Sequence, residues 1–199
     1  MLQYLVIIGA IVNLFGSLSY IKETLKGNTK PNRVTWFLWS LAPLIATTAA
    51  LVDGVRLSVL PVFMSGFCPL LVFLFSFVNR NSYWKLEKFD YICGTFSLLA
   101  LILWGITKEP AIAIIFAILS DGFACVPTIA KAWKFPETET GAPFITGLFS
   151  AFTSFFAIKI WNFTSFAFPI YLVIACSILI FSVYRKKVFC LLEKLIYKY

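Results

Sequence analysis

The chain of 199 residues contains no histidine and only nine acidic residues. Without an imidazole it lacks the Ser-His-Asp and Cys-His catalytic arrangements, histidine metal ligands and histidine proton relays. The five cysteines form no C-x-x-C pair, so neither a zinc site nor a disulfide framework is indicated. A glycine-rich phosphate loop is also missing. We therefore expect no metal, no cofactor and no enzymatic activity.

Long polar stretches are equally scarce. Hydrophobic residues make up 60% of the chain and charged residues 13%, with a mean hydropathy of +0.89. This composition excludes a soluble globule. A membrane-spanning helix needs roughly 20 apolar residues, and the segments that qualify are 2–21, 34–52, 57–79, 88–107, 110–133, 142–160 and 163–184. The sequence predicts an all-α, polytopic membrane protein with seven transmembrane helices.

Basic residues are distributed unevenly over the loops between these segments. With the N-terminus outside, all but three of the 17 lysines and arginines lie in inner loops or in the C-terminal tail. The three exceptions are Arg56, Lys108 and Lys159. This positive-inside bias predicts an N-terminus outside the membrane and a C-terminus in the cytoplasm. The net charge of +8 then reflects orientation in the lipid bilayer, and we expect no nucleic-acid partner.

The two ends of the chain resemble each other when the sequence is shifted against itself. At an offset of 108 the aligned pairs include Asn13 with Asp121, Phe15 with Phe123, Pro61 with Pro169 and Cys68 with Cys176. At an offset of 110 the aligned pairs are Leu38 with Leu148, Trp39 with Phe149 and Ser40 with Ser150. A duplicated membrane unit usually encloses a substrate path between its two copies. The repeat therefore favours a transporter.

This repeat predicts an organisation of three, one and three helices. The first three-helix repeat covers 1–80 and the second covers 110–185. Direct duplication of three helices would invert the second copy, so a single inverter helix in 81–109 restores its orientation. The remaining residues, 186–199, are predicted to form a basic amphipathic cytoplasmic tail. The expected fold is two parallel three-helix bundles joined by the inverter helix, with homo-oligomerisation left open.

Asp121 is the only acidic residue well inside a predicted span. It lies ten residues from the outer edge near Ala111, which places it ~15 Å deep, at the bilayer midplane. An ionised carboxylate is costly there, and no lysine or arginine lies at that depth to pair with it. Two interpretations remain open. Asp121 and Asn13 form a substrate or proton site at the repeat interface, or a neutral Asp121 is hydrogen-bonded to Asn13 and links two helices.

Aromatic and hydroxyl side chains supply the other candidates for this site. Trp36 and Trp39 share one helix face. Trp36 lies just inside the membrane, where an interfacial aromatic belt explains it, whereas Trp39 lies one turn deeper and is a candidate wall of the site. The repeat adds Phe149, Ser40 and Ser150 as substrate- or proton-binding candidates, although a serine in a membrane helix often bonds its own backbone.

A proline interrupts the fifth predicted span below the acidic residue. Pro127 lacks an amide hydrogen and disrupts the hydrogen bond to the carbonyl of Phe123. A kink just below Asp121 suits a gating helix. A static bend, which is common in membrane helices, is the alternative.

Short motifs near the inner ends of the first and fifth spans indicate a family. The stretches concerned are Val126-Pro127-Thr128-Ile129-Ala130-Lys131, Trp133-Lys134 and Gly141, and in the first repeat Leu18-Ser19-Tyr20-Ile21-Lys22 and Lys30-Pro31-Asn32-Arg33. With the three, one, three topology they resemble the PQ-loop superfamily, which includes the SWEET sugar transporters, cystinosin-type transporters and the KDEL receptor. Threonine replaces glutamine in the second copy, and Ser-Tyr replaces Pro-Gln in the first. The resemblance implies a gating role for the motif positions, which here are Pro127, Thr128, Ser19 and Tyr20.

Together these features predict a small-solute membrane transporter with alternating access between two repeats. Its partners are the lipid bilayer and a small-molecule solute, and proton coupling through Asp121 is left open. One alternative is a vitamin-precursor carrier similar to the nicotinamide riboside transporters, which share the seven-helix plan. Another is a non-transporting membrane receptor or assembly protein. The short loops and the resemblance favour the cytoplasmic membrane of a bacterium.

Overall fold

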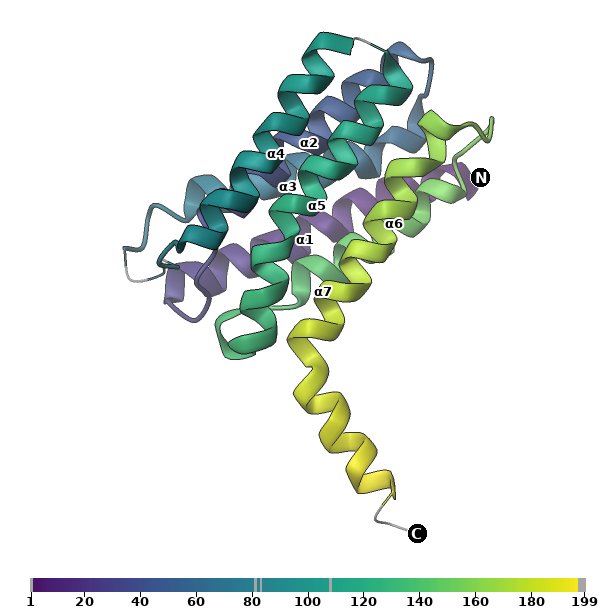
Figure 1. Ribbon diagram of the computed structural model, residues 1–199. Helices are drawn as coiled ribbons and strands as arrows, with labels where there is room; N and C mark the ends of the chain where they lie inside the picture. The colour runs from purple at the N-terminus through teal and green to yellow at the C-terminus, as the bar shows by residue number, and fades with distance from the viewer. Residues whose placement is uncertain (1, 81, 83, 108, 197–199) are drawn as a thin grey trace.

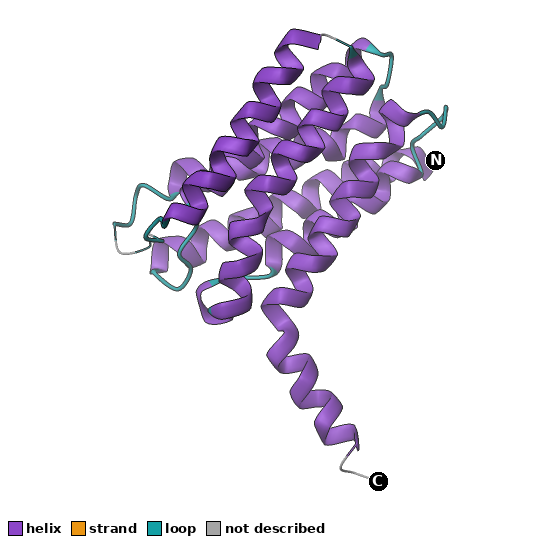
Figure 2. Cartoon of the chain, viewed as in Figure 1, coloured by secondary structure: helices purple, strands orange, loops and turns teal. Residues whose placement is uncertain are grey.

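The computed structural model describes residues 2–80, 82, 84–107 and 109–196. These residues form α-helices, three short 3-10 helices and no strands (Figure 2). The α-helices are α1 (Leu5–Lys26), α2 (Arg33–Val52), α3 (Leu60–Phe75), α4 (Lys88–Thr107), α5 (Pro110–Lys134), α6 (Ala142–Phe155) and α7 (Phe163–Ile196). The prediction of an all-α fold is confirmed for the described part of the chain.

Five of the described helical segments are long and apolar enough to cross a membrane. They are Leu5–Lys26, Arg33–Val52, Leu57–Phe75, Pro110–Lys134 and Phe163–Lys186. Large apolar side chains also cover the outside of the bundle; Phe15 and Ile106, for example, are 67% and 71% exposed. Such a surface is compatible with lipid and not with water. The apolar helices thus indicate a membrane-embedded protein.

Helix α6 is shorter than the span predicted over 142–160. It has 14 residues, which corresponds to about 21 Å, less than the ~30 Å hydrocarbon core. The amides of Ala157 and Ile158 both turn back to the carbonyl of Ser154, at 3.0 and 3.2 Å, and close the last turn. The chain then leaves the helix and reaches Asn162, whose side chain accepts a hydrogen bond from the Ser165 amide at the start of α7.

The helices before residue 80 and those after residue 110 contact one another in a regular way. Helix α3 packs against α1 and α2, and α7 packs against α5 and α6. Between these two groups α1 packs against α6, and α2 packs against α5. Helix α4 lies at the edge of the bundle, against α5 and α2 (Figure 1). We call α1–α3 the first half and α5–α7 the second half.

The contact between α1 and α6 depends on two glycines of α1. A Cβ atom on Gly9 would lie 2.4 Å from Oγ1 of Thr153, and one on Gly16 would lie 1.9 Å from Oγ1 of Thr146. The two glycines are seven residues apart on α1, and the two threonines are seven residues apart on α6 in the reverse order. The two helices are therefore antiparallel. Glycine is required here because no other residue permits this approach.

The contact between α2 and α5 is made of alanines instead. Ala42, Ala46 and Ala50 of α2 lie in one buried cluster with Ala113 and Ala117 of α5. Small side chains on both helices give a smooth surface with few interlocking groups. Small residues thus form part of both contacts between the two halves, and α2 and α5 are also joined by hydrogen bonds from Thr35 and Trp39 to backbone carbonyls of α5.

The loop between α1 and α2 is fixed by polar groups. Helix α1 ends at Gly27, which adopts the left-handed conformation with φ of 88°. Asn32 caps the start of α2: its side-chain oxygen accepts from the amides of Val34 and Thr35 at 3.1 and 3.3 Å. The side-chain amide of Asn32 also donates to Asp90 at 2.6 Å. This second bond attaches the start of α4 to the start of α2.

The C-terminal end of α7 projects away from the bundle (Figure 1). Its backbone is helical as far as Ile196. The side chains from residue 187 onward, apart from Phe189, lie outside the described residues, as do residues 197–199. The amphipathic character of the tail over 186–199 therefore stays a prediction.

Candidate functional site

A cavity of about 70 Å³ lies where six helices of the two halves meet. Every helix of the first half and every helix of the second half contributes to its wall. Sites that enclose a drug-sized ligand usually measure roughly 300–1,000 Å³, so this cavity accommodates waters or a small headgroup. The polar atoms and sulfurs on its wall belong to Asn13, Ser17, Ser65, Cys68, Asp121 and Cys176. We call this cavity the central cavity.

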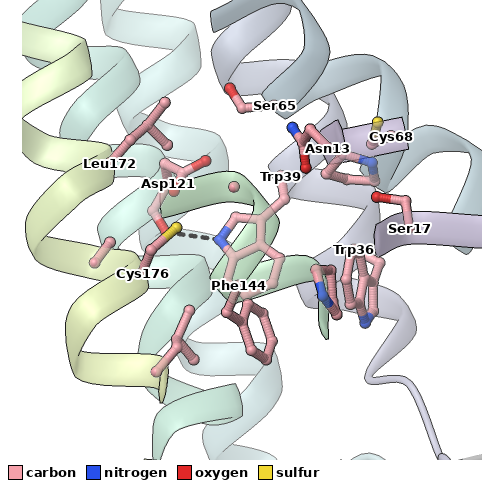
Figure 3. Close-up of a pocket in the computed structure, with 15 residues that line it drawn as sticks. Asn13, Ser17, Trp36, Trp39, Ser65, Cys68, Asp121, Phe144, Leu172 and Cys176 are labelled. Atoms are coloured by element: carbon pink, nitrogen blue, oxygen red, sulfur yellow. Dashed lines mark hydrogen bonds between the residues drawn. The ribbon is translucent and has the colours of Figure 1, made fainter. Parts of the chain in front are cut away.

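Asp121 on α5 is buried, at 5% exposed, in the wall of the central cavity. Its Oδ2 atom accepts a hydrogen bond of 2.6 Å from the hydroxyl of Tyr171 on α7. Its backbone carbonyl accepts one of 3.3 Å from Nε1 of Trp39 on α2 (Figure 3). Among the described residues no lysine or arginine forms an ion pair with it. The carboxyl is thus held by the Tyr171 hydroxyl, the indole of Trp39 bonds the backbone of the same residue, and the carboxyl has no described counter-charge.

Asn13 on α1 lies in the same wall and is also buried. The structure therefore brings Asn13 and Asp121 together around one space. No hydrogen bond joins their side chains in the described part of the chain; the partner of the carboxylate is Tyr171 instead. Asn13 therefore does not connect α1 to α5 through a side-chain hydrogen bond to Asp121.

Three aromatic side chains form one wall of the central cavity. The rings of Trp36 and Trp39 are 5.2 Å apart and nearly perpendicular. Phe144 on α6 lies 6.1 Å from Trp39 and 6.5 Å from Trp36. In Figure 3 the indole of Trp39 lies between Asp121 and Phe144. The cavity thus combines one carboxylate with a continuous aromatic surface.

The structure corrects the interpretation of Trp36 as part of an interfacial belt. Trp36 is only 2% exposed and faces the central cavity. Its Nε1 atom is buried and has no hydrogen-bond acceptor among the described residues. Its ring packs on Tyr20 at 4.8 Å, so both residues lie inside the bundle. The position in the sequence could not reveal this, because burial depends on how α2 is rotated about its axis.

The predicted partners Phe149, Ser40 and Ser150 do not line the central cavity. Phe149 is 46% exposed and points away from the bundle interior. The hydroxyl of Ser40 donates to the carbonyl of Phe37 at 2.6 Å, which is the backbone bond that membrane serines often make. Ser150 is buried, and its hydroxyl has no described partner.

Sequence reasoning missed Phe144 and Gly147 as cavity groups, assigned Trp36 to the interface instead, and missed Tyr171 as the partner of Asp121. The aromatic residues have the same spacing as lipid-facing ones, so no signal identifies them. Tyr171 carries the one clue, since a hydroxyl deep in an apolar helix needs an acceptor.

The predicted gating residues are spread over different surroundings. Tyr20 and Thr128 are fully buried, and the Thr128 hydroxyl has no described partner. Pro127 is buried inside α5, in the wall of a separate pocket at the start of α4. Ser19 is exposed on the outside of α1. Tyr20 joins the two halves through its hydrogen bond to Glu139.

A buried polar cluster closes the bundle at the end that carries the α1–α2 and α5–α6 loops. Glu139 accepts from the hydroxyl of Tyr20 at 2.8 Å and from Nζ of Lys131 at 2.6 Å. Lys131 also donates to the backbone carbonyl of Lys30. The side chains of Lys131 and Glu139 are 1% and 0% exposed. We call Tyr20, Lys131 and Glu139 the lock, because it ties α1 and its loop to α5 and its loop.

A second pocket, of about 280 Å³, lies at the opposite end between the α2–α3 and α6–α7 loops. Arg56 and Lys159, two of the three basic residues predicted outside, line it. Between it and the central cavity the alanines of α2 and α5 pack with Phe168 and Leu172 of α7. Packed side chains thus lie between the central cavity and either end of the bundle.

Substitution of Gly147 by alanine is expected to shrink the central cavity without unfolding the protein. A Cβ atom there would lie 3.4 Å from Sγ of Cys176 and 3.8 Å from Oδ1 of Asn13. Helix propensity favours alanine by about 1 kcal/mol. Thermal unfolding should show no loss of stability. In a background with Cys176 as the only cysteine, its reaction with methyl methanethiosulfonate should be slower; an unchanged rate would contradict this position for Gly147.

Comparison of the chain with protein-family models, with curated proteins and with solved structures gives no match.

Proposed function

We propose that this protein is a small-solute membrane transporter with alternating access, in which α1–α3 and α5–α7 are two repeats that move around the central cavity. The observation that carries this proposal is the place of Asp121. A carboxylate without a counter-charge lies in a cavity to which every helix of both halves contributes. Ionisable groups at such positions in membrane proteins mark substrate or proton pathways.

The pairing of helices supports two repeats. If α1, α2 and α3 correspond to α5, α6 and α7, each contact has a counterpart in the other half. The contact α1–α3 matches α5–α7, α2–α3 matches α6–α7, and α1–α6 matches α5–α2. This exchange is expected around a pseudo-two-fold axis between parallel repeats. Helix α4 then takes the role of the inverter, and the topology has the N-terminus outside.

The contacts between the halves support movement. Glycines line the α1–α6 contact and alanines line part of the α2–α5 contact, so in these regions one half can rock against the other with few interlocked side chains to separate. The lock and the alanine cluster lie on opposite sides of the central cavity. Opening either one while the other stays closed would give access from one side at a time.

A receptor or assembly protein is the second candidate, since a ligand could bind in the central cavity without crossing the membrane. A receptor needs access from one side only. Packed groups at both ends of the cavity favour a carrier over this alternative.

The test is uptake by purified protein in liposomes, with a panel of sugars, amino acids, nucleosides and organic cations, with and without an inward proton gradient. Asp121→Asn should lower uptake of the transported solute on the order of tenfold or more, because a charge-dependent contact of at least 1.4 kcal/mol is lost. The matched control is Ser177→Ala, whose exposed hydroxyl bonds only the carbonyl of Val173. Equal uptake by native protein and Asp121→Asn would contradict the assigned role.

A further inference from the structure

We propose that the central cavity binds a small organic cation, whose positive charge lies against Asp121 and the faces of Trp36, Trp39 and Phe144. Transport of this cation rests on the proposed function, whereas its binding in the cavity does not. It names the class of solute: an ammonium or quaternary ammonium group rather than a sugar or an anion.

The first argument is the missing counter-charge. The described residues form two ion pairs, Lys26 with Glu23 and Lys131 with Glu139, and neither includes Asp121. Tyr171 occupies one carboxylate oxygen, Oδ2, and no described group donates to the other. A buried carboxylate without a cation is unfavourable unless a ligand or a proton neutralises it. A cationic solute would supply this charge within the cavity.

The second argument is the aromatic wall. Trp36, Trp39 and Phe144 are each less than 10% exposed and lie within 5.2 to 6.5 Å of one another, measured between ring centres. Tryptophan faces attract cations most strongly among aromatic rings, and the attraction increases when water is excluded. Aromatic groups surrounding a charge are how proteins recognise quaternary ammonium ligands.

The third argument is the shortage of groups for other solutes. Besides Asp121, the polar side chains in the wall are Asn13, Ser17, Ser65 and the two indoles. Nε1 of Trp39 is already bonded to the Asp121 carbonyl, and the hydroxyl of Ser65 donates to the carbonyl of Val62. A sugar would leave several hydroxyls without partners, which is costly in a buried site. An anion would meet the carboxylate, with no lysine or arginine in the wall.

The fourth argument is size. The cavity of about 70 Å³, roughly half the volume of the ~150 Å³ cavity that holds benzene, admits a small ammonium group and not a disaccharide. A methylated ammonium group needs no hydrogen-bond donor from the protein, so it fits a wall that is mostly apolar.

The experiment measures binding to the purified native protein by isothermal titration calorimetry, without liposomes. The probes are methylammonium, tetramethylammonium and choline. The neutral control is 3,3-dimethyl-1-butanol, which has the shape of choline and lacks its charge. We expect saturable binding of at least one cation. We expect the neutral alcohol to bind on the order of 30-fold more weakly than choline where choline binds, because it cannot pair with the carboxylate.

Variants separate charge from shape. Asp121→Asn should weaken cation binding on the order of 30-fold or more. Trp36→Leu should weaken it by about 3- to 30-fold, and Trp36→Phe should restore part of the loss because it keeps an aromatic face. Trp36 also provides the test if Asp121→Asn fails to fold, since Nε1 of Trp36 has no described partner to lose. Ser177→Ala should bind as the native protein does.

Two results would overturn the inference: no saturable binding of any of the three cations, or equal binding of choline and the neutral alcohol. Uptake of a neutral solute by liposomes together with absent cation binding would retain the transporter and reject the cation. Saturable, Asp121-dependent cation binding without uptake would retain the cation and reject the transporter.

Discussion

Replacement of Lys131 by methionine is expected to lower the free energy of unfolding by about 3–5 kcal/mol, because it leaves the charge of Glu139 buried and unpaired. Glu139 has a fully buried side chain, and its partners are Nζ of Lys131 and the hydroxyl of Tyr20. The remaining hydroxyl cannot compensate a full charge. Reversible unfolding in sodium dodecyl sulfate measures the loss.

A double-mutant cycle with Glu139→Gln shows whether the loss comes from the unpaired charge. Removal of both charges should leave the double variant more stable than Lys131→Met alone, since replacing a whole buried pair is often neutral. The matched control is the exposed pair of Lys26 and Glu23, with side chains 53% and 28% exposed. Lys26→Met should change the stability by less than about 1 kcal/mol. Equal effects at Lys131 and Lys26 would contradict the burial of the lock.

Gly9→Ala is expected to destabilise the protein by about 1–3 kcal/mol, the usual cost of overpacking. An alanine elsewhere in a helix stabilises by about 1 kcal/mol relative to glycine, so the sign of the effect is reversed here. The cause is the approach of α6, where Oγ1 of Thr153 would lie 2.4 Å from the new Cβ atom. The closer contact at Gly16 predicts a larger loss for Gly16→Ala.

The second substitution Thr153→Ala should restore most of the stability lost in Gly9→Ala. It removes the two Thr153 atoms nearest to the new methyl group and leaves the Cα atom of Ser150 at 3.1 Å. Gly105→Ala is the matched control, because no described atom lies within 4 Å of a Cβ atom there. Thermal unfolding of the four variants provides the comparison. A stabilising Gly9→Ala would show that α1 and α6 are farther apart than described.

The fold class could be predicted because apolar runs of helical length have few alternatives in so hydrophobic a chain. The end of α6 could not, since four of the five residues 156–160 are apolar and continue the hydrophobic run although the backbone turns at Ser154. Hydropathy measures affinity for lipid and does not record where the helix stops. The buried loop residues Ala157 and Ile158 therefore have the composition of a span.

The candidate site was predicted where burial is chemically costly. Asp121 could be found because a carboxylate in an apolar helix needs an explanation, and the repeat then indicated Asn13. Phe149 was assigned from the repeat offset, but the rotation of α6 places it outside. The lock could not be predicted from the sequence, since the sequence position of Lys131 does not distinguish it from other basic residues near the inner membrane surface. Tyr20 and Glu139 are 119 residues apart in the sequence, and only the fold brings them into contact.

Access to the central cavity from both sides of the membrane tests alternating access most directly. Ser65 lines this cavity, so Ser65→Cys, in a background with the five native cysteines replaced, places one reactive thiol there. Inside-out and right-side-out vesicles are treated with a membrane-impermeant methanethiosulfonate reagent. Alternating access predicts labelling from either side, with protection by the transported solute. Labelling from one side only would contradict it and support a receptor.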